Sequence, residues 1–550
     1  SRRRLLDEQF LVYMALTRAS RGLRVSYSLA DEEGRALVPS LLVSHLQELF
    51  PALREELLAA EPGEECAAEA GEGGGAEVDD EVKAEKLLQY IAHPRRALSH
   101  LAVQLSRWKK DGEIHPLWWD VYNWYAGEEA WRRLAGHLLG GLFYDNREEP
   151  LVLETSRQLY GKKLRAGVSR LEKFRSCPFS HFISYGLRLR ERQIYRLELP
   201  DIGRFFHAAL RNFAATLLEK GLEWGELDRE SCLQLAAEEV ERLVPRLQKE
   251  ILLSSSRYRY LGEKMKETVG RAVLALGEQA RHSSFKVAGV ELSFGPGELL
   301  PGLAIELENG CRVELAGRID RVDMARDREG QAYLRVIDYK SGRTELKIPE
   351  VYYGLSLQML VYLDVLLEGA YAWLQETALP AGVLYFRVHT PVVNASPGRL
   401  PDPAQVEKMM RRRFKMKGLV LEDREIVRMM DGSLQKGHSE IIPVGLTADG
   451  RFHKNSATIT RERLELLRRH VRRLIEETAG GITGGQVEIR PYRLGKSNAC
   501  RYCPYKAICQ FDTSLEGNSY RVLKSEKAER IWYYLEKNRE GEGGGDDGEQ

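Results

Sequence analysis

The residues best suited to chemistry are two aspartates and a lysine in neighbouring apolar segments. Asp320 ends the first run, within residues 317–323, and Asp338 ends the second, with Lys340 two positions later. Alternate residues of a strand face the same side of a sheet, so Asp338 and Lys340 are expected to point into one site. A hairpin that pairs the two segments would place Asp320 beside Asp338. The two carboxylates would repel each other unless a divalent cation lay between them.

Oxygen ligands in this number favour Mg²⁺ or Mn²⁺. Such an ion polarises a scissile phosphate and lowers the pKa of an attacking water, while Lys340 would stabilise the developing charge or orient that water. A single Asp-x-Lys carries little information, because an aspartate in a surface hairpin is usually solvated. The pair of acids, each ending a strand, favours a catalytic metal site.

Three further side chains are candidates for the same site. His207 lies on an amphipathic helix directly before the strand region, and a neutral imidazole would provide a third metal ligand. Gln358 and Tyr362 are four residues apart on one helix face, where they could bind DNA phosphate or the lysine. Each has an ordinary alternative: packing or solvation for His207, and an unrelated polar pair for Gln358 and Tyr362.

Three of the seven cysteines form a second candidate site. Cys500, Cys503 and Cys509 have the spacing C-x2-C-x5-C, which is one ligand short of a tetrahedral metal shell. Cys177 is the best fourth ligand, because the proline after it places it at a helix start. Zinc and a 4Fe-4S cluster both accept four thiolates, and the spacing leaves both open. Ligation by Cys177 would close a loop of more than 300 residues and act structurally.

Composition excludes several classes of protein. Apolar residues make up 43% and charged residues 30% of the 550, and no apolar run is long enough to span a membrane, so an integral membrane protein is excluded. An odd number of cysteines argues against a secreted disulfide scaffold and for the cytoplasm. The net charge of +1 gives no global sign of a nucleic-acid partner. Any DNA contact would use local basic segments such as 411–415 and 468–473, whose alternative is a solvated helix face.

The elements predict a mixed α/β protein. Residues 1–60 suggest a helix, a strand at Leu23–Leu29 and a second helix, and 83–145 and 166–285 are mostly helical. Strands are expected at 286–294, 311–324, 333–339 and 382–388. A helix is expected at 354–367, and further helices between the last of these strands and residue 480. The predicted domains are 1–60, an acidic linker at 61–81, a helical region at 82–160, the main domain at 161–520, and a helix with a disordered acidic tail at 521–550.

Taken in chain order, the motifs around Cys177, His207, Asp320, Asp338 to Lys340, Gln358 to Tyr362 and the C-terminal cysteines resemble one known group. This is the RecB-like branch of PD-(D/E)xK nucleases that carries an iron-sulfur cluster, and within it the AddB family of helicase-nuclease proteins. The resemblance covers most of residues 1–60 and 166–515. It implies a restriction-endonuclease-type domain with a mixed central sheet flanked by helices. By this resemblance, His207, Asp320 and Asp338 would hold the metal, Lys340 would be the catalytic lysine, Gln358 and Tyr362 would complete the site, and Cys177, Cys500, Cys503 and Cys509 would bind a 4Fe-4S cluster.

Residues 13–20 resemble the last motif of UvrD-like helicases, which would make Arg18 an arginine finger for the ATP γ-phosphate. The sequence has no G-x-x-x-x-G-K-[ST] loop, so ATP hydrolysis by this chain alone is not expected, and the chain is interpreted as part of a longer polypeptide. The implied activity is Mg²⁺-dependent DNA cleavage at double-strand ends, with an AddA-like helicase subunit as partner. The alternatives are a catalytically inactive DNA-binding scaffold and an autonomous iron-sulfur exonuclease. Because Asp320, Asp338 and Lys340 are all present, an active nuclease is favoured over the inactive scaffold.

Overall fold

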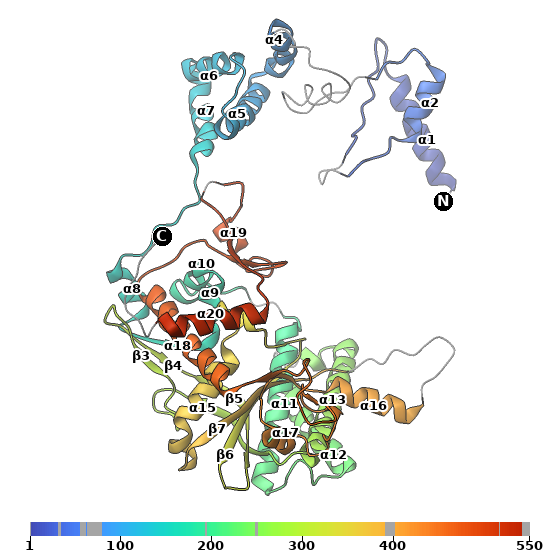
Figure 1. The fold of residues 1–550 in the computed structure, drawn as a ribbon. Helices are drawn as coiled ribbons and strands as arrows, with labels where there is room; N and C mark the ends of the chain where they lie inside the picture. Colours follow the sequence, from blue (N-terminus) through green and yellow to red (C-terminus); the bar gives the residue numbers. More distant parts are fainter. Residues whose placement is uncertain are drawn as a thin grey trace. The chain divides into compact units, whose positions relative to one another are not determined.

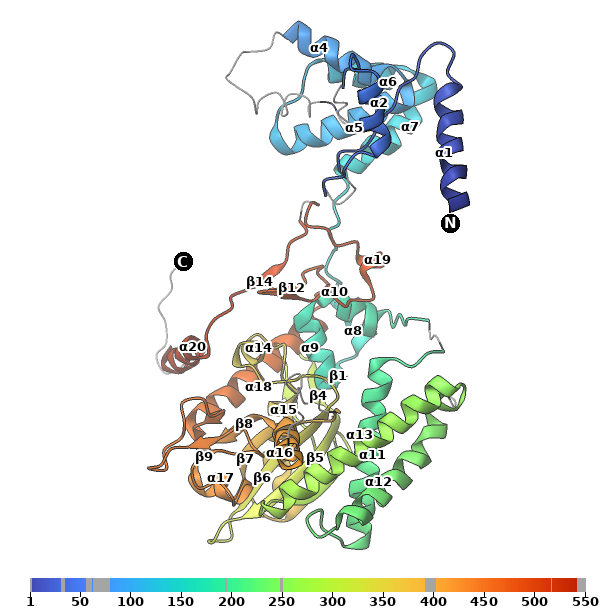
Figure 2. The same cartoon turned by 90° about the vertical axis from the view of Figure 1, so that its right-hand side faces the viewer.

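The computed structural model describes residues 2–30, 35–55, 62, 80–192, 195–247, 251–390, 402–515 and 517–541. The chain forms two compact units, Ser1–Tyr144 and Asp145–Gln550, which are described separately (Figures 1 and 2). The finer domain boundaries stay predictions, and most of the predicted linker at 61–81, Cys66 and the tail at 542–550 lie outside the described residues. Within those residues, no helix combines the length and the apolar character needed to cross a bilayer.

The first unit is helical, as predicted for most of its length. Trp118 and Tyr125 of α6 pack with Leu98 and Leu101 of α5 in a small core. The strand expected at Leu23–Leu29 is wrong: within the described part of this unit the segment joins no sheet, and an extended segment without partners has no ladder to hold it. The helices are α1 (Arg2–Thr17), α2 (Leu41–Leu49), α4 (Asp80–Leu88), α5 (Pro94–Asp111), α6 (Leu117–Gly127) and α7 (Glu129–Gly140), with short 3-10 turns at Gln89–Ile91 and Gly141–Phe143.

The second unit is built on a mixed six-stranded sheet, which confirms the predicted mixed α/β class. Its strand order is β11-β8-β7-β6-β5-β2, with β6/β7 and β8/β11 parallel and the other neighbours antiparallel. Helix α15 (Gln358–Leu374) contacts β6 and β7, and α11 (Leu199–Lys220) contacts β2 and β6. The strands are β2 (Lys286–Phe294), β5 (Gly317–Arg326), β6 (Ala332–Lys340), β7 (Ala378–Arg387), β8 (Lys417–Leu421) and β11 (Thr458–Ile459).

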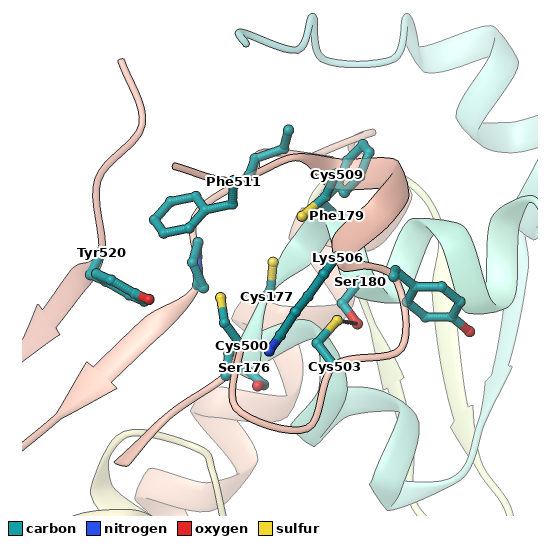
Figure 3. Close-up of a pocket in the computed structure, with 14 residues that line it drawn as sticks. Ser176, Cys177, Phe179, Ser180, Cys500, Cys503, Lys506, Cys509, Phe511 and Tyr520 are labelled. Atoms are coloured by element: carbon teal, nitrogen blue, oxygen red, sulfur yellow. Dashed lines mark hydrogen bonds between the residues drawn. The ribbon is translucent and has the colours of Figure 1, made fainter. Parts of the chain in front are cut away.

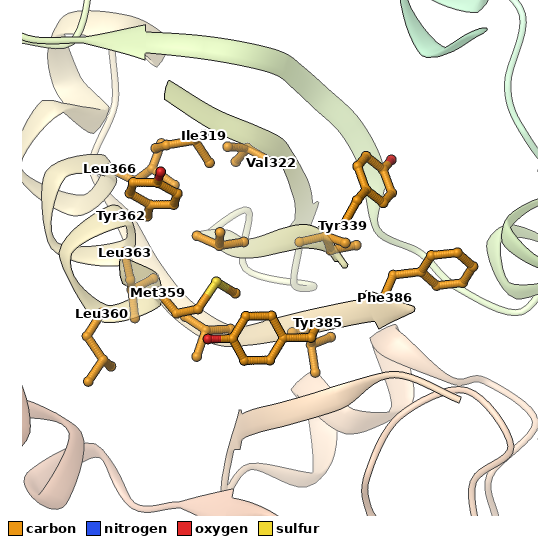
Figure 4. Packing of buried hydrophobic residues seen from close by; sticks show 14 of the residues in the cluster. Ile319, Val322, Tyr339, Met359, Leu360, Tyr362, Leu363, Leu366, Tyr385 and Phe386 are labelled. Atoms are coloured by element: carbon orange, nitrogen blue, oxygen red, sulfur yellow. The ribbon is translucent and has the colours of Figure 1, made fainter. Parts of the chain in front are cut away.

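The centre of this sheet is buried on both faces. Every residue of β6 before Lys340 is buried, as expected for a central strand with helices on its faces. Helix α15 is apolar around most of its surface, and Figure 4 shows its Tyr362 and Leu363 gathered with Ile319 of β5 and Tyr385 of β7. The polar ends of β6 and α15 therefore extend from a rigid apolar core.

In the second unit, three further predicted elements differ from the structure. The strand expected over 311–324 breaks at Ala316, because β4 (Arg312–Leu315) pairs with β1 (Lys163–Ala166) and β3 (Ala304–Glu306) whereas β5 joins the large sheet. The helix expected from Gly354 begins at Gln358, since Gly354 takes a left-handed turn conformation with φ +78°. Among the described residues between β7 and residue 480 there are four strands as well as helices, so the all-helical prediction for this region is wrong.

The remaining elements cover the sheet or extend from it. The helices are α8 (Leu153–Tyr160), α9 (Val168–Ser176), α10 (Pro178–His181), α12 (Arg229–Leu243), α13 (Ser256–Arg281), α14 (Ile348–Tyr352), α16 (Pro403–Arg413), α17 (Arg424–Met430), α18 (Arg461–Thr483), α19 (Lys506–Cys509) and α20 (Ala528–Gly541). The smaller strands are β1 (Lys163–Ala166), β3 (Ala304–Glu306), β4 (Arg312–Leu315), β9 (Gly437–His438), β10 (Gly445–Leu446), β12 (Tyr492–Leu494), β13 (Ser497–Asn498) and β14 (Arg521–Leu523).

Candidate active site and cysteine site

The β5–β6 hairpin brings the two predicted acids together. Arg321 lies opposite Ile337 in the antiparallel register, so the next step places Asp320 opposite Asp338. Asp320 Oδ2 also accepts a hydrogen bond from the backbone N–H of Tyr339 at 3.0 Å. Both acids lie within their strands and not at the ends, because β5 and β6 continue past them. The predicted side-by-side arrangement of the carboxylates is confirmed.

Asp338 is the buried member of the pair, with 1% of its surface exposed. Lys340 Nζ lies 2.7 Å from its Oδ2, and Gln358 Nε2 donates to its Oδ1 at 2.9 Å. Burial and the charge of Asp320 raise the pKa of Asp338 to about 6, although Lys340 and His207 act against this rise. The carboxylate is therefore charged at neutral pH, but at an energetic cost.

His207 reaches the same carboxylates from α11. Its Nδ1 lies 3.0 Å from Asp320 Oδ2. Burial alone would lower the pKa of His207, but the hydrogen bond to Asp320 and the charges of Asp320 and Asp338 outweigh burial, so the net pKa is raised. The imidazole is thus held against the acid pair.

Gln358 connects the lysine, the buried acid and Tyr362. Lys340 Nζ donates to Gln358 Oε1 at 3.4 Å, and Gln358 Nε2 donates to Tyr362 Oη at 3.1 Å as well as to Asp338. All six side chains predicted for this site are therefore brought together by β5, β6, α11 and α15.

Sequence reasoning missed two neighbours of this site. Glu172 on α9 accepts hydrogen bonds from the backbone N–H groups of Leu357 and Gln358 at 2.7 and 3.1 Å. The ring of Tyr385 on β7 lies 5.9 Å from Lys340 Nζ, opposite Asp338 in the parallel register. Nothing in the spacing of the sequence connects residues so far apart.

The carboxylate site has the chemistry of a divalent-cation site. Across the described ranges, no three His, Cys, Asp or Glu side chains form a group that could hold a metal ion as they stand. At this site each acid is paired with Lys340 or His207 instead. Two adjacent, largely buried carboxylates fit a small hard cation, because the ion would offset both their repulsion and their desolvation.

The four predicted cysteines line one cavity of about 280 Å³ (Figure 3). Cys500, Cys503 and Cys509 come from the loop and short helix α19, and Cys177 directly precedes α10. Burial raises the pKa of the Cys177 thiol to about 11, against the effect of backbone hydrogen bonds from neighbouring residues. A bound metal centre would supply the positive charge that such thiolates need.

Other contacts hold the C-terminal segment in place. Asn146 Nδ2 donates to the carbonyl of Cys509 at 2.7 Å, and Ser184 Oγ donates to Tyr505 Oη at 3.0 Å. The segment that carries three cysteines is therefore held both by the irregular segment before α8 and by the helical turn Phe182–Gly186 that follows α10.

One further prediction concerns ATP. Arg18 is exposed in the turn after α1 of the first unit, and its ATP-related role stays a prediction.

Another prediction concerns DNA. In the basic segment 468–473, Arg468 and Arg472 bind the buried carboxylate of Asp364, with their Nε atoms at 2.7 and 2.6 Å from its oxygens. These two arginines stabilise the α15–α18 contact. Part of the basic segment 468–473 is therefore used inside the fold and is not available as a DNA-binding surface.

Comparison with known proteins places these features in a family context. The family model of the PD-(D/E)XK nuclease superfamily matches residues 165–510, and the model of the fifth domain of ATP-dependent helicase/deoxyribonuclease AddB matches residues 83–141. The chain is 47% identical over 534 residues to the B subunit of the ATP-dependent helicase/deoxyribonuclease of Pelotomaculum thermopropionicum, covering 97% of this chain and 44% of that protein.

A second relative shows a similar identity and a similar coverage. The corresponding ATP-dependent helicase/deoxyribonuclease protein of Bacillus subtilis is 44% identical over 541 residues, which cover 98% of this chain and 44% of that protein. The chain thus spans less than half the length of these curated relatives.

Proposed function

The chain belongs to the PD-(D/E)XK nuclease superfamily, and from this premise we propose that its second unit cleaves DNA with Mg²⁺ or Mn²⁺. The observation that carries the proposal is the convergence of Asp320, Asp338 and Lys340 on two adjacent strands, where Lys340 pairs with Asp338 and Asp320 accepts from the backbone N–H of Tyr339 between them. Asp320, Asp338 and His207 would hold the ion. The bound ion would polarise the scissile phosphate and lower the pKa of the attacking water.

The protein side chains would orient the reacting groups. Lys340 keeps 27% of its side chain exposed while its ammonium is fixed by Asp338, so it can reach a phosphate oxygen at the site. Gln358 limits the movement of that ammonium and of the Asp338 carboxylate through its amide, and Tyr362 in turn accepts from Gln358. These contacts support one fixed geometry for the attack on phosphorus.

The four cysteines would bind a 4Fe-4S cluster with a structural role. A single Zn²⁺ lies about 2.3 Å from each of four sulfurs and leaves no space between them. The four thiols line one cavity, and the resemblance to the RecB-like nucleases that carry an iron-sulfur cluster favours the cluster over zinc. Ligation would tie Cys177 to the segment 500–509 and so hold the two ends of the nuclease region together.

The relatives' names suggest the biological setting. They are called helicase/deoxyribonuclease subunits, so we place this chain in a cytoplasmic heterodimer with an AddA-like helicase subunit. The complex would process DNA double-strand ends for recombinational repair, with this unit cleaving one unwound strand. The match of residues 83–141 to an AddB domain disfavours an autonomous exonuclease.

The decisive test compares two aspartate variants. Asp338→Asn should reduce Mg²⁺-dependent cleavage of end-labelled single-stranded DNA by roughly a thousandfold or more, because the variant loses a metal ligand. Asp449→Asn, at an exposed turn, should cleave like the wild type. DNA binding, measured by fluorescence anisotropy, should be similar in all three proteins. A wild-type protein that binds DNA and does not cleave it would support the inactive scaffold instead.

A further inference from the structure

Helix α15 begins at the nuclease site without a cap from its own segment. Leu357 precedes its first residue and provides no side-chain hydrogen bond. The first N–H groups of a helix have no partner within the helix, and they carry a partial positive charge. Here Glu172 Oε1 accepts from the N–H groups of Leu357 and Gln358, at 2.7 and 3.1 Å. A carboxylate of another helix, α9, thus caps α15.

This cap acts on the residue that organises the site. Gln358 is the first residue of α15, and its amide contacts Asp338, Lys340 and Tyr362. A shift of its backbone would move all three hydrogen bonds at once. Glu172 is also close enough for the charges of Lys340 and Asp338 to act on its carboxyl.

We propose that Glu172 is a positioning residue of the nuclease site, which fixes the start of α15 so that Gln358 holds Lys340 and Asp338 in place. The inference rests on the proposed function and extends it to a residue outside the predicted metal site. Glu172 acts through the backbone of α15 and is not assigned a contact with substrate.

The location of Glu172 makes the proposal testable. Its side chain lines an open groove of about 340 Å³, so its truncation would not leave a sealed cavity in the core. Glu477 provides a matched control, because it also contacts α9, through Arg175 at 3.5 Å, and is half exposed. Glu477→Ala removes a carboxylate next to α9 while leaving the α15 cap intact.

The experiment measures cleavage of single-stranded DNA at saturating Mg²⁺. Glu172→Ala should lower kcat roughly 10- to 100-fold with KM for DNA changed less than about threefold, because the binding surface stays and the alignment is lost. Glu172→Gln should stay within about fivefold of the wild type, since its amide oxygen can accept from the same N–H groups. Glu477→Ala should leave kcat unchanged.

The outcomes separate this inference from the proposed function. If Asp338→Asn still cleaves, the proposed function fails. If Asp338→Asn is inactive and Glu172→Ala keeps kcat within threefold of the wild type, only the positioning role fails. It also fails if Glu172→Gln loses as much kcat as Glu172→Ala. If Glu172→Ala does not fold, Glu172→Asp replaces it, because the shorter side chain moves the carboxylate away from the N–H groups of Leu357 and Gln358. Glu172→Asp should then show the loss of kcat expected of Glu172→Ala, and a kcat within threefold of the wild type would overturn the positioning role.

Discussion

Replacement of Asp338 by Asn is expected to stabilise the protein at neutral pH while removing cleavage. The pKa of this buried carboxyl is raised from 3.8 to about 6, because burial and Asp320 disfavour its charge. The folded protein therefore binds the proton more tightly than the unfolded chain does. The resulting stabilisation is complete below about pH 4 and is lost as the pH rises through 6. At about 1.4 kcal/mol per pKa unit, the charged carboxylate costs roughly 3 kcal/mol above pH 6.

An asparagine avoids most of that cost. Its amide cannot ionise and can still accept from Gln358, although the ion pair with Lys340 is lost. We expect a net gain of about 2 kcal/mol. For a unit of roughly 400 residues the unfolding entropy is about 0.8 kcal/mol per kelvin, so the melting temperature should rise by about 2 °C.

The assay is scanning calorimetry in EDTA at pH 7.5 and pH 4. The gain should be present at pH 7.5 and largely lost at pH 4, where the folded wild-type carboxyl is protonated and the unfolded one, with a pKa of 3.8, is protonated in part. Added Mg²⁺ should stabilise the wild type and not the variant. Asp449→Asn serves as the control with no gain. If the variant melts below the wild type at pH 7.5, or gains as much stability at pH 4, the charged Asp338 carboxylate does not destabilise the fold.

Three further predictions concern the lysine, the cysteines and a buried histidine. Lys340→Met should lower kcat roughly 100- to 1,000-fold in single-turnover cleavage, whereas Lys347→Met, at an exposed lysine, should have no effect; equal rates would contradict the catalytic role. Cys503→Ser should reduce bound iron measured by mass spectrometry, and an unchanged iron content would exclude Cys503 as a ligand. Burial lowers the pKa of His181 to about 3, so the unfolded chain binds a proton more readily and this residue's contribution to stability falls as the pH drops below 6.5. Wild type should lose about 2 kcal/mol more than His181→Gln between pH 7 and 5 in urea unfolding, and parallel pH curves would contradict this assignment.

The centre of the candidate site could be predicted because it depends on local geometry. Alternation along a strand places Asp338 and Lys340 on one side whatever the rest of the fold does. A short connection between two apolar strands makes their antiparallel pairing the simplest arrangement, and this pairing places Asp320 beside Asp338. The bounds of β2 and β6 were likewise predicted to within one residue.

The supporting contacts could not be predicted because they depend on tertiary packing. Glu172 reaches α15 from a helix nearly 190 residues earlier, and Tyr385 faces Lys340 through a parallel register that no local pattern sets. The strand expected at Leu23–Leu29 had the right alternation but no partner strand in the described part of its unit. By contrast, Cys177 could be matched to the distant cysteines, because a metal shell on the C-terminal trio would require a fourth ligand, and all four cysteines line one cavity.

Anomalous X-ray scattering from crystals of the protein grown with Mn²⁺ would locate the bound ion. We expect a strong manganese peak between the carboxylates of Asp320 and Asp338, at ligand distances of roughly 2.0–2.6 Å, with His207 beside it. A peak at another site, or none here in protein that cleaves DNA with Mn²⁺, would contradict the claim that these two acids hold the catalytic ion.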